Sequence, residues 1–100
     1  VLDKAVSQKD LAELRIYRGT CKLGLKDLPG ATTEFKDAVA KEPNNALAHY
    51  SLGNALADGG KLTDAISEWE TYLKLAPEGP QAKAAEKKIA IAKAKAGGKK

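Results

Sequence analysis

Apolar residues along this chain recur every three or four positions, and no stretch alternates residue by residue between apolar and polar. This spacing places apolar side chains on one face of an α-helix, whereas a half-buried strand requires alternation. Glycine and proline separate the helical stretches, because both residues favour turns over helix interiors. The pattern predicts five helices, at about residues 11–25, 31–42, 46–58, 63–75 and 80–96.

Most of the predicted helices carry a recognisable apolar face. We expect these faces to consist of Leu11, Leu14, Tyr17, Cys21 and Leu25 in the first helix, Phe35, Ala38 and Val39 in the second, Ala65, Ile66, Trp69, Tyr72 and Leu73 in the fourth, and Ala82, Ala85, Ile89, Ala92 and Ala96 in the fifth. The fifth face is narrow and mostly alanine on a lysine-rich helix. Such a helix suits the end of a stack, where one side is buried and the other is wet.

The chain also repeats itself with a period of 34 residues. The clearest correspondences are Gly19 with Gly53, Ala31 with Ala65, Phe35 with Trp69 and Pro43 with Pro77. A fixed period of this size indicates a solenoid of stacked helical units. We expect the small residues where two helices cross closely and the aromatic residue in the gap between them. Such stacks usually present a concave surface to a partner.

The landmarks of the repeat resemble those of the tetratricopeptide repeat family. Residues 46–79 match the family at four landmarks. Leu52-Gly53 stands where the family has Leu-Gly, Ala65 where it has Ala, Trp69 where it has a large aromatic residue, and Pro77 where it has Pro. Residues 12–45 keep Gly19, Ala31, Phe35, Ala38 and Pro43, but have Arg15, Arg18 and Lys22 where the family prefers Trp, Leu and Tyr. The resemblance implies an all-α helical repeat: an α-solenoid of two 34-residue units, a C-terminal capping helix at residues 80–96 and a basic tail at 97–100.

Residues 1–11 form a leader with two interpretations. Val1 aligns with Phe35 and Ala5 with Val39 at the same 34-residue step, which fits the remnant of an upstream unit's second helix. We expect the chain, which begins without Met, to be a processed product or a piece of a longer one. In the alternative, residues 7–10 are a capping box that starts a longer first helix.

The resemblance implies that the first helix of each unit lines a concave groove. The groove residues expected on this basis are Glu13, Ile16, Thr20 and Leu23 from the first unit, and Leu47, Tyr50, Asn54, Ala57 and Asp58 from the second. The amide of Asn54 both donates and accepts hydrogen bonds, as a partner backbone requires. Tyr50 offers flat amphipathic area of the kind enriched at interfaces. The alternatives are an ordinary polar surface residue for Asn54 and packing between units for Tyr50.

Several members of the family bind a C-terminal carboxylate with Lys, Asn, Asn, Lys and Arg. The corresponding residues here are Ile16, Thr20, Asn54, Ala84 and Lys88. Only Asn54 matches, with Lys88 as a candidate cation. We therefore do not expect this clamp.

Nothing in the sequence indicates catalysis, a cofactor or a metal. The single Cys and single His are too few for a zinc site, and no phosphate-binding glycine loop is present. We expect His49 to be a half-buried structural residue, Cys21 to be a small core residue, and Trp69 and Tyr72 to belong to the core.

Charge is distributed unevenly along the chain. Residues 81–100 contain seven lysines and one glutamate, so they contribute +6 to a net charge of +4 and leave −2 for the first eighty residues. A basic helix can bind nucleic acid or an anionic membrane, and electrostatic tethering is therefore the alternative function. The segment has no aromatic residue or arginine for base stacking or base readout, which favours a solvated face.

The sequence thus predicts a protein–protein interaction scaffold whose groove binds a peptide or helical segment of another protein, and it leaves self-association open. The absence of a run of about 20 apolar residues indicates a soluble protein. Cytoplasmic localisation is slightly favoured, with a periplasmic or exported protein as the alternative.

Overall fold

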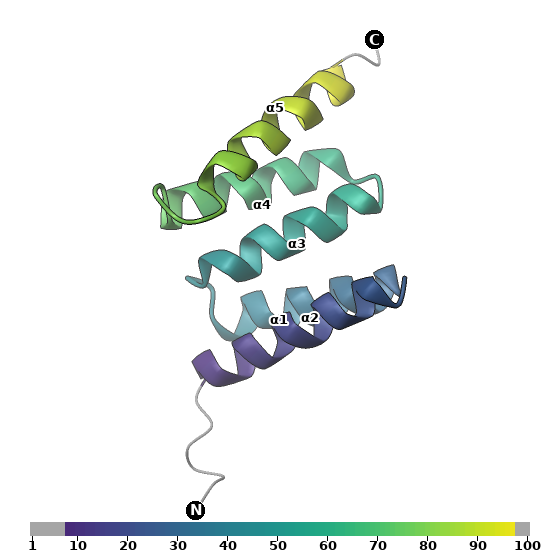
Figure 1. Ribbon diagram of the computed structural model, residues 1–100, viewed down its shortest axis with the longest axis vertical. Helices are drawn as coiled ribbons and strands as arrows, with labels where there is room; N and C mark the ends of the chain where they lie inside the picture. Colours follow the sequence, from purple (N-terminus) through teal and green to yellow (C-terminus); the bar gives the residue numbers. More distant parts are fainter. Residues whose placement is uncertain (1–7, 98–100) are drawn as a thin grey trace, which may run out of the picture.

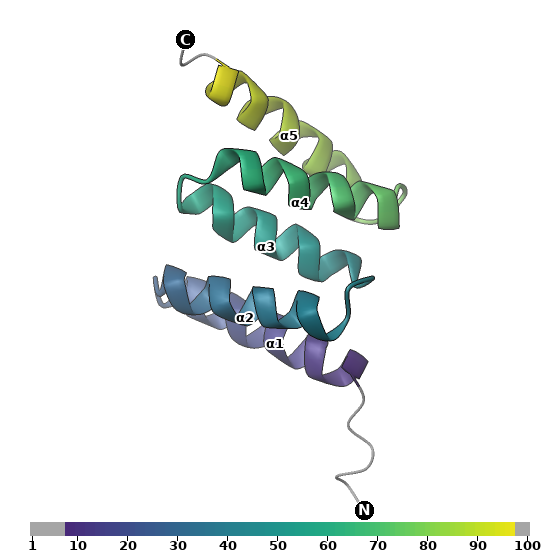
Figure 2. The same cartoon turned by 180° about the vertical axis from the view of Figure 1, so that it is seen from behind.

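The computed structural model describes residues 8–97, which form five α-helices and no strand (Figure 1). The helices are α1 (Gln8–Gly24), α2 (Leu28–Lys41), α3 (Ala46–Asp58), α4 (Leu62–Leu75) and α5 (Ala82–Gly97). Helices α1, α3 and α5 lie on the side seen in Figure 1, and α2 and α4 lie on the side seen in Figure 2. Each helix packs on the next one along the chain, as expected for an all-α solenoid.

Local capping explains where α2 and α3 begin. The carboxylate of Asp27 accepts a hydrogen bond from the backbone N–H of Gly30 at 3.0 Å, and Pro29 occupies the first turn of α2. The side chain of Asn45 accepts from the N–H of Ala48 at 3.1 Å, which confirms the predicted cap of α3. Both caps satisfy N–H groups that have no partner within the helix.

The turns after α1 and α3 adopt left-handed backbone at equivalent positions. Gly60 has φ +84°, and Lys26, which lies 34 residues earlier, has φ +64°. Glycine takes this conformation at little cost, whereas a side chain with a Cβ is strained there. The repeat therefore fixes the turn geometry even where the residue type does not suit it.

Each unit closes by placing an aromatic ring directly on a glycine. A Cβ atom added to Gly19 would lie 2.5 Å from the ring of Phe35, and one added to Gly53 would lie 2.6 Å from the indole of Trp69. Both rings are almost fully buried. The predicted close helix crossing, with the aromatic residue filling the gap, is confirmed in both units.

The face predicted for the first helix is wrong. Leu14, Tyr17 and Leu25 are 48%, 67% and 79% exposed, and Cys21 is also exposed instead of lying in the core. The residues that α1 buries are Ala12, Ile16 and Gly19. The reason is steric, since α1 approaches α2 on the side where Gly19 admits the ring of Phe35. Ala96, predicted on the buried face of α5, is exposed near the end of that helix.

The first helix begins at Gln8, three residues before the predicted start, as the alternative of a longer first helix requires. Residues 1–7, on which both interpretations of the leader depend, lie outside the described residues, as do residues 98–100 of the predicted basic tail.

Polar contacts at one repeat position join the two helices of each unit. The Nδ1 and Nε2 atoms of His49 lie 2.7 Å from Oε1 of Glu68 and 2.7 Å from the carbonyl oxygen of Pro43. Arg15 and Glu34 occupy the equivalent positions in the first unit and pair at 3.3 Å. His49 is buried with both nitrogens engaged, which agrees with the structural role predicted for it.

Candidate partner-binding groove

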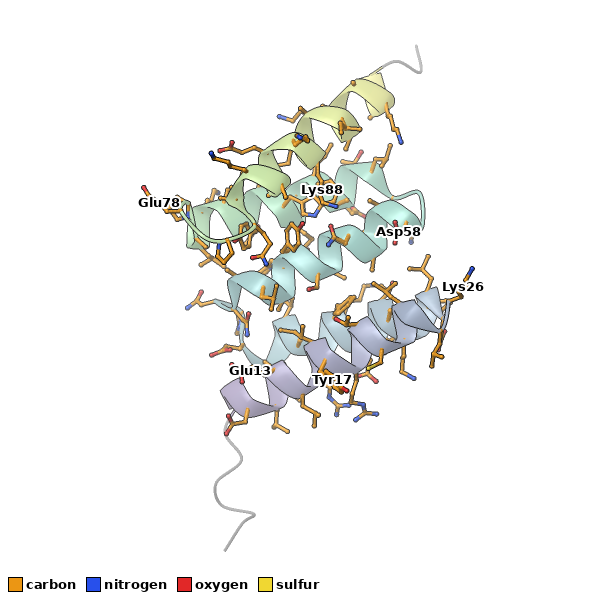
Figure 3. All side chains as sticks on the ribbon, viewed as in Figure 1. Glu13, Tyr17, Lys26, Asp58, Glu78 and Lys88 are labelled. Atoms are coloured by element: carbon orange, nitrogen blue, oxygen red, sulfur yellow. The ribbon has the colours of Figure 1, made fainter. Side chains whose placement is uncertain are left out.

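A cleft of about 200 Å³ lies between α3 and α5, on the side of the molecule seen in Figure 3. Its lining comes from three helices and consists of Ala57, Asp58, Leu62, Trp69, Lys88, Ile91, Ala92 and Lys95. Lys88 lies between α5 and α3 in this view, and Asp58 lies at the end of α3 (Figure 3). We call this cleft, together with Tyr50 and Asn54 of α3, the α3–α5 groove.

The aromatic residues beneath the groove hold Asn54 in one orientation. The indole Nε1–H of Trp69 donates a hydrogen bond to Oδ1 of Asn54 at 3.1 Å. An indole N–H can only donate, so the amide oxygen must face it and the amide NH₂ group must face away. Within residues 8–97, that NH₂ group has no hydrogen-bond partner, and Asn54 is only half-buried.

Lys88 lies over two aromatic rings. Its Nζ atom is 5.8 Å from the ring centroid of Tyr50 and 5.9 Å from that of Trp69. Each such cation–π contact is worth roughly 0.5–1 kcal/mol when exposed and more when water is excluded. Lys88 is half-buried, unlike the other described lysines of α5. Its charge is therefore held in the groove instead of moving freely in solvent.

Tyr50 and Tyr72 extend the aromatic floor of the groove toward the start of α5. Their ring centroids are 5.4 Å apart at an interplanar angle of 52°. The hydroxyl of Tyr72 donates to Oε1 of Gln81 at 3.1 Å and accepts from the backbone N–H of Gln81 at 3.0 Å. These contacts fix the beginning of α5 against α4. Trp69 and Tyr72 are core residues, as predicted.

Only some of the predicted groove residues come together in the structure. Tyr50, Asn54 and Lys88 come together through their shared contacts with Trp69 and Tyr72, and Asp58 lines the cleft. Leu47 is 42% exposed on α3, one turn before Tyr50.

The α1 residues do not line the α3–α5 cleft. Ile16 is only 7% exposed and belongs to the core, so its prediction as a groove contact is wrong. The hydroxyl of Thr20 donates to the carbonyl of Ile16 at 2.9 Å, within α1 itself. Glu13 is exposed, and Leu23 is half-buried against the core.

Sequence reasoning missed Ile91 and Lys95, which line the cleft from α5 together with Lys88 and Ala92. Ile91 is 51% exposed although it is a large aliphatic residue. The sequence contained a signal for Ile91, because this large apolar residue lies outside the apolar face predicted to pack α5 on the stack.

A second cleft, of about 300 Å³, lies between α2 and α3, where the two units meet. It is lined by Leu28, Pro29, Thr32, Lys36, Ala55, Leu56, Gly59 and Lys61.

Within residues 8–97, no cluster of three or more His, Cys, Asp or Glu is placed to hold a metal ion.

The stacked antiparallel pairs and the groove on one side define a helical-repeat protein of the α-solenoid class. The family profile described as tetratricopeptide repeat matches residues 18–83, about two-thirds of the chain. The chain belongs to the tetratricopeptide repeat family. Repeats of this family generally mediate protein–protein interactions. No curated protein matches the chain.

None of the helices in residues 8–97 has both the length and the apolar character needed to cross a membrane.

Proposed function

We propose that this chain is a protein-interaction module whose α3–α5 groove binds an extended segment of another protein. The observation that carries the proposal is the hydrogen bond from Trp69 to Asn54, because it aims the Asn54 NH₂ group away from the core. Lys88 adds a second donor beside it, held over Tyr50 and Trp69. Two fixed donors match carbonyl or carboxylate oxygens of a partner chain.

Apolar contact accompanies the two donors. Tyr50 and Leu47 offer partly exposed apolar surface on α3, and Ile91 lines the cleft from α5 and is 51% exposed. A binding site that combines a few polar groups of fixed orientation with apolar surface gains affinity from burial and specificity from the polar groups. We therefore expect a partner segment with an apolar side chain next to a backbone carbonyl or an acidic residue.

The test begins with selection of peptides from a displayed random library on the immobilised chain, followed by measurement of Kd for the consensus peptide. Asn54→Asp is the sharpest variant, because a carboxylate oxygen still accepts from Trp69 while the NH₂ donor is lost. Lys88→Gln removes the positive charge of the second donor at similar length. Each change should weaken binding by about tenfold or more, since Asn54→Asp removes a hydrogen bond to a partner acceptor and Lys88→Gln removes the charge that strengthens one.

Lys93→Gln is the matched control. It removes the same charge from the same helix, but Lys93 lies 3.7 Å from Glu70 of α4 and does not line the cleft. Its Kd should stay within about twofold of the unmodified chain, as expected for an exposed ion pair. If Asn54→Asp and Lys88→Gln both bind as tightly as Lys93→Gln does, the groove is not the binding site.

Tethering to nucleic acid or an anionic membrane through residues 81–100 stays a prediction. Two of the lysines counted for it have neighbours within the fold, since Lys88 lies over aromatic rings and Lys93 pairs with Glu70. Duplex DNA and phosphatidylserine vesicles, titrated at rising salt, test this alternative directly, because counterion release makes tethering steeply salt-dependent.

A further inference from the structure

The side of α1 that faces away from α3 is an exposed apolar surface. We call it the α1 outer face and define it by Leu14, Tyr17, Cys21 and Leu25, all of which are exposed. Tyr17 lies on this outer side of α1 in Figure 3. Large apolar residues gathered on one face of a helix usually mark a contact surface.

The internal repeat indicates what covers such a face. The residues of α3 that lie 34 positions after Leu14 and Cys21 are Ala48 and Ala55, which are 0% and 1% exposed. Ala55 shares a cleft with Leu28 and Thr32 of the preceding helix, α2. The residues of α5 that lie a further 34 positions on are Ala82 and Ile89, and they are buried where α5 packs on α4. In α3 and α5, therefore, this face lies against the preceding helix.

The α1 outer face differs from its two equivalents in size. Leu14 stands where the later helices have Ala48 and Ala82, and Tyr17 stands where they have Ser51 and Ala85. A helix lying along α1 as α2 lies along α3 must accommodate this extra volume. It can do so at the usual helix separation of about 8–10 Å only if it carries small residues opposite Leu14 and Tyr17.

One edge of the α1 outer face carries positive charge that the equivalent positions of α3 lack. Arg18 and Lys22 stand where α3 has Leu52 and Leu56, both of which are buried. The side chain of Arg18 is 48% exposed although it lies 3.5 Å from Glu34, and that of Lys22 is 37% exposed although it lies 4.0 Å from Asp27. Two cations along one edge favour a helix with acidic residues on the matching edge.

We propose that the α1 outer face binds an amphipathic α-helix of a partner protein, with small apolar residues at its centre and acidic residues along the edge that meets Arg18 and Lys22. This helix lies along α1 as α2 lies along α3. The site is separate from the α3–α5 groove, and it adds a second interaction surface to the function proposed above.

Cys21 provides the readout, because it is the only cysteine in the chain and lies within the face. The probes are two synthetic 14-residue helical peptides with the same alanine and serine face, one with four glutamates along one edge and the other with four lysines. The rate of alkylation of Cys21 by iodoacetamide is measured on the full chain with each peptide, and binding is measured separately by fluorescence anisotropy.

The acidic peptide should slow alkylation in proportion to its occupancy and should bind at least about tenfold more tightly than the lysine peptide. Arg18→Glu and Lys22→Glu should each reduce that preference. Tyr17→Asp should abolish protection, and it should leave the circular dichroism spectrum unchanged because Tyr17 is 67% exposed. Asn54→Asp should leave protection intact, which separates this site from the groove.

Three results would overturn the proposal. One is equal protection of Cys21 by both peptides, and another is no protection by either at millimolar concentration. The third is slowing of alkylation by the chain's own concentration without peptide, together with dimers in sedimentation, because the occupant would then be a second copy.

Discussion

The indole of Trp69 and the side chain of Asn54 form a hydrogen bond of 3.1 Å that links the core of the second unit to its groove. Trp69 is 3% exposed, so its N–H has little access to water as a substitute acceptor. The same bond therefore has a structural role, in satisfying a buried donor, and an orienting role, in fixing the Asn54 amide.

These two roles can be separated by substitution. Asn54→Leu leaves the Trp69 N–H without an acceptor and should lower the free energy of unfolding by about 1–3 kcal/mol. Asn54→Asp keeps an acceptor and should cost clearly less. Urea denaturation followed by Trp69 fluorescence measures both. Equal losses for the two variants would show that the hydrogen bond contributes little to stability.

The contacts at Gly19 and Gly53 leave no room for a side chain. Gly19→Ala and Gly53→Ala each place a Cβ less than 3 Å from an aromatic ring, and each should destabilise the fold by about 1–3 kcal/mol. Gly24→Ala is the matched control, because nothing lies within 4 Å of its added Cβ. Thermal unfolding should show the control at or above the stability of the unmodified chain.

The left-handed turn at Lys26 predicts a stabilising substitution. Lys26→Gly relieves the strain of a side chain at φ +64° and should raise the free energy of unfolding by about 1 kcal/mol. The reciprocal change, Gly60→Lys at φ +84°, should lower it by a similar amount. Chemical denaturation of both variants tests the pair, and a loss of stability in Lys26→Gly would contradict the strain argument.

The equivalent polar contacts of the two units should differ in strength. His49 is 8% exposed, and His49→Leu removes the partner of both Glu68 and the Pro43 carbonyl, at a cost of about 1–3 kcal/mol. The side chain of Arg15 is 30% exposed, and Glu34 keeps Arg18 at 3.5 Å when Arg15 is removed, so Arg15→Leu should cost less, at about 1 kcal/mol. A double-mutant cycle of His49→Leu with Glu68→Leu isolates the pair, and additive losses would indicate that it is uncoupled.

The 34-residue period predicted the architecture because it depends on a few small and aromatic residues that meet within each unit. Gly53 and Trp69 are adjacent in the structure as the alignment implies. The caps and prolines placed the helix boundaries to within about three residues. Tyr50 and Asn54 are half-buried, and their role as groove residues stays a prediction.

The face of α1 could not be predicted in the same way, because α1 carries apolar residues on two sides. The spacing of Leu14, Tyr17 and Cys21 is as regular as that of Ala12, Ile16 and Gly19. Only the fit of Phe35 onto Gly19 decides which side packs on α2. The alignment of Cys21 with buried Ala55 wrongly predicted that Cys21 is buried. Helix α3 has a preceding helix to pack on, whereas α1 has none among residues 8–97.

Small residues on the docking faces of α3 and α5 make the second unit modular. Ala48 and Ala55 fit the helix before them, and the back of the second unit already accepts a helix with Ala82 and Ala85 on the same face. Residues 46–79 can therefore follow a copy of themselves, and a longer array can be built by inserting them in tandem. Residues 12–45 cannot be propagated in this manner, because Leu14 and Tyr17 would collide with the unit in front.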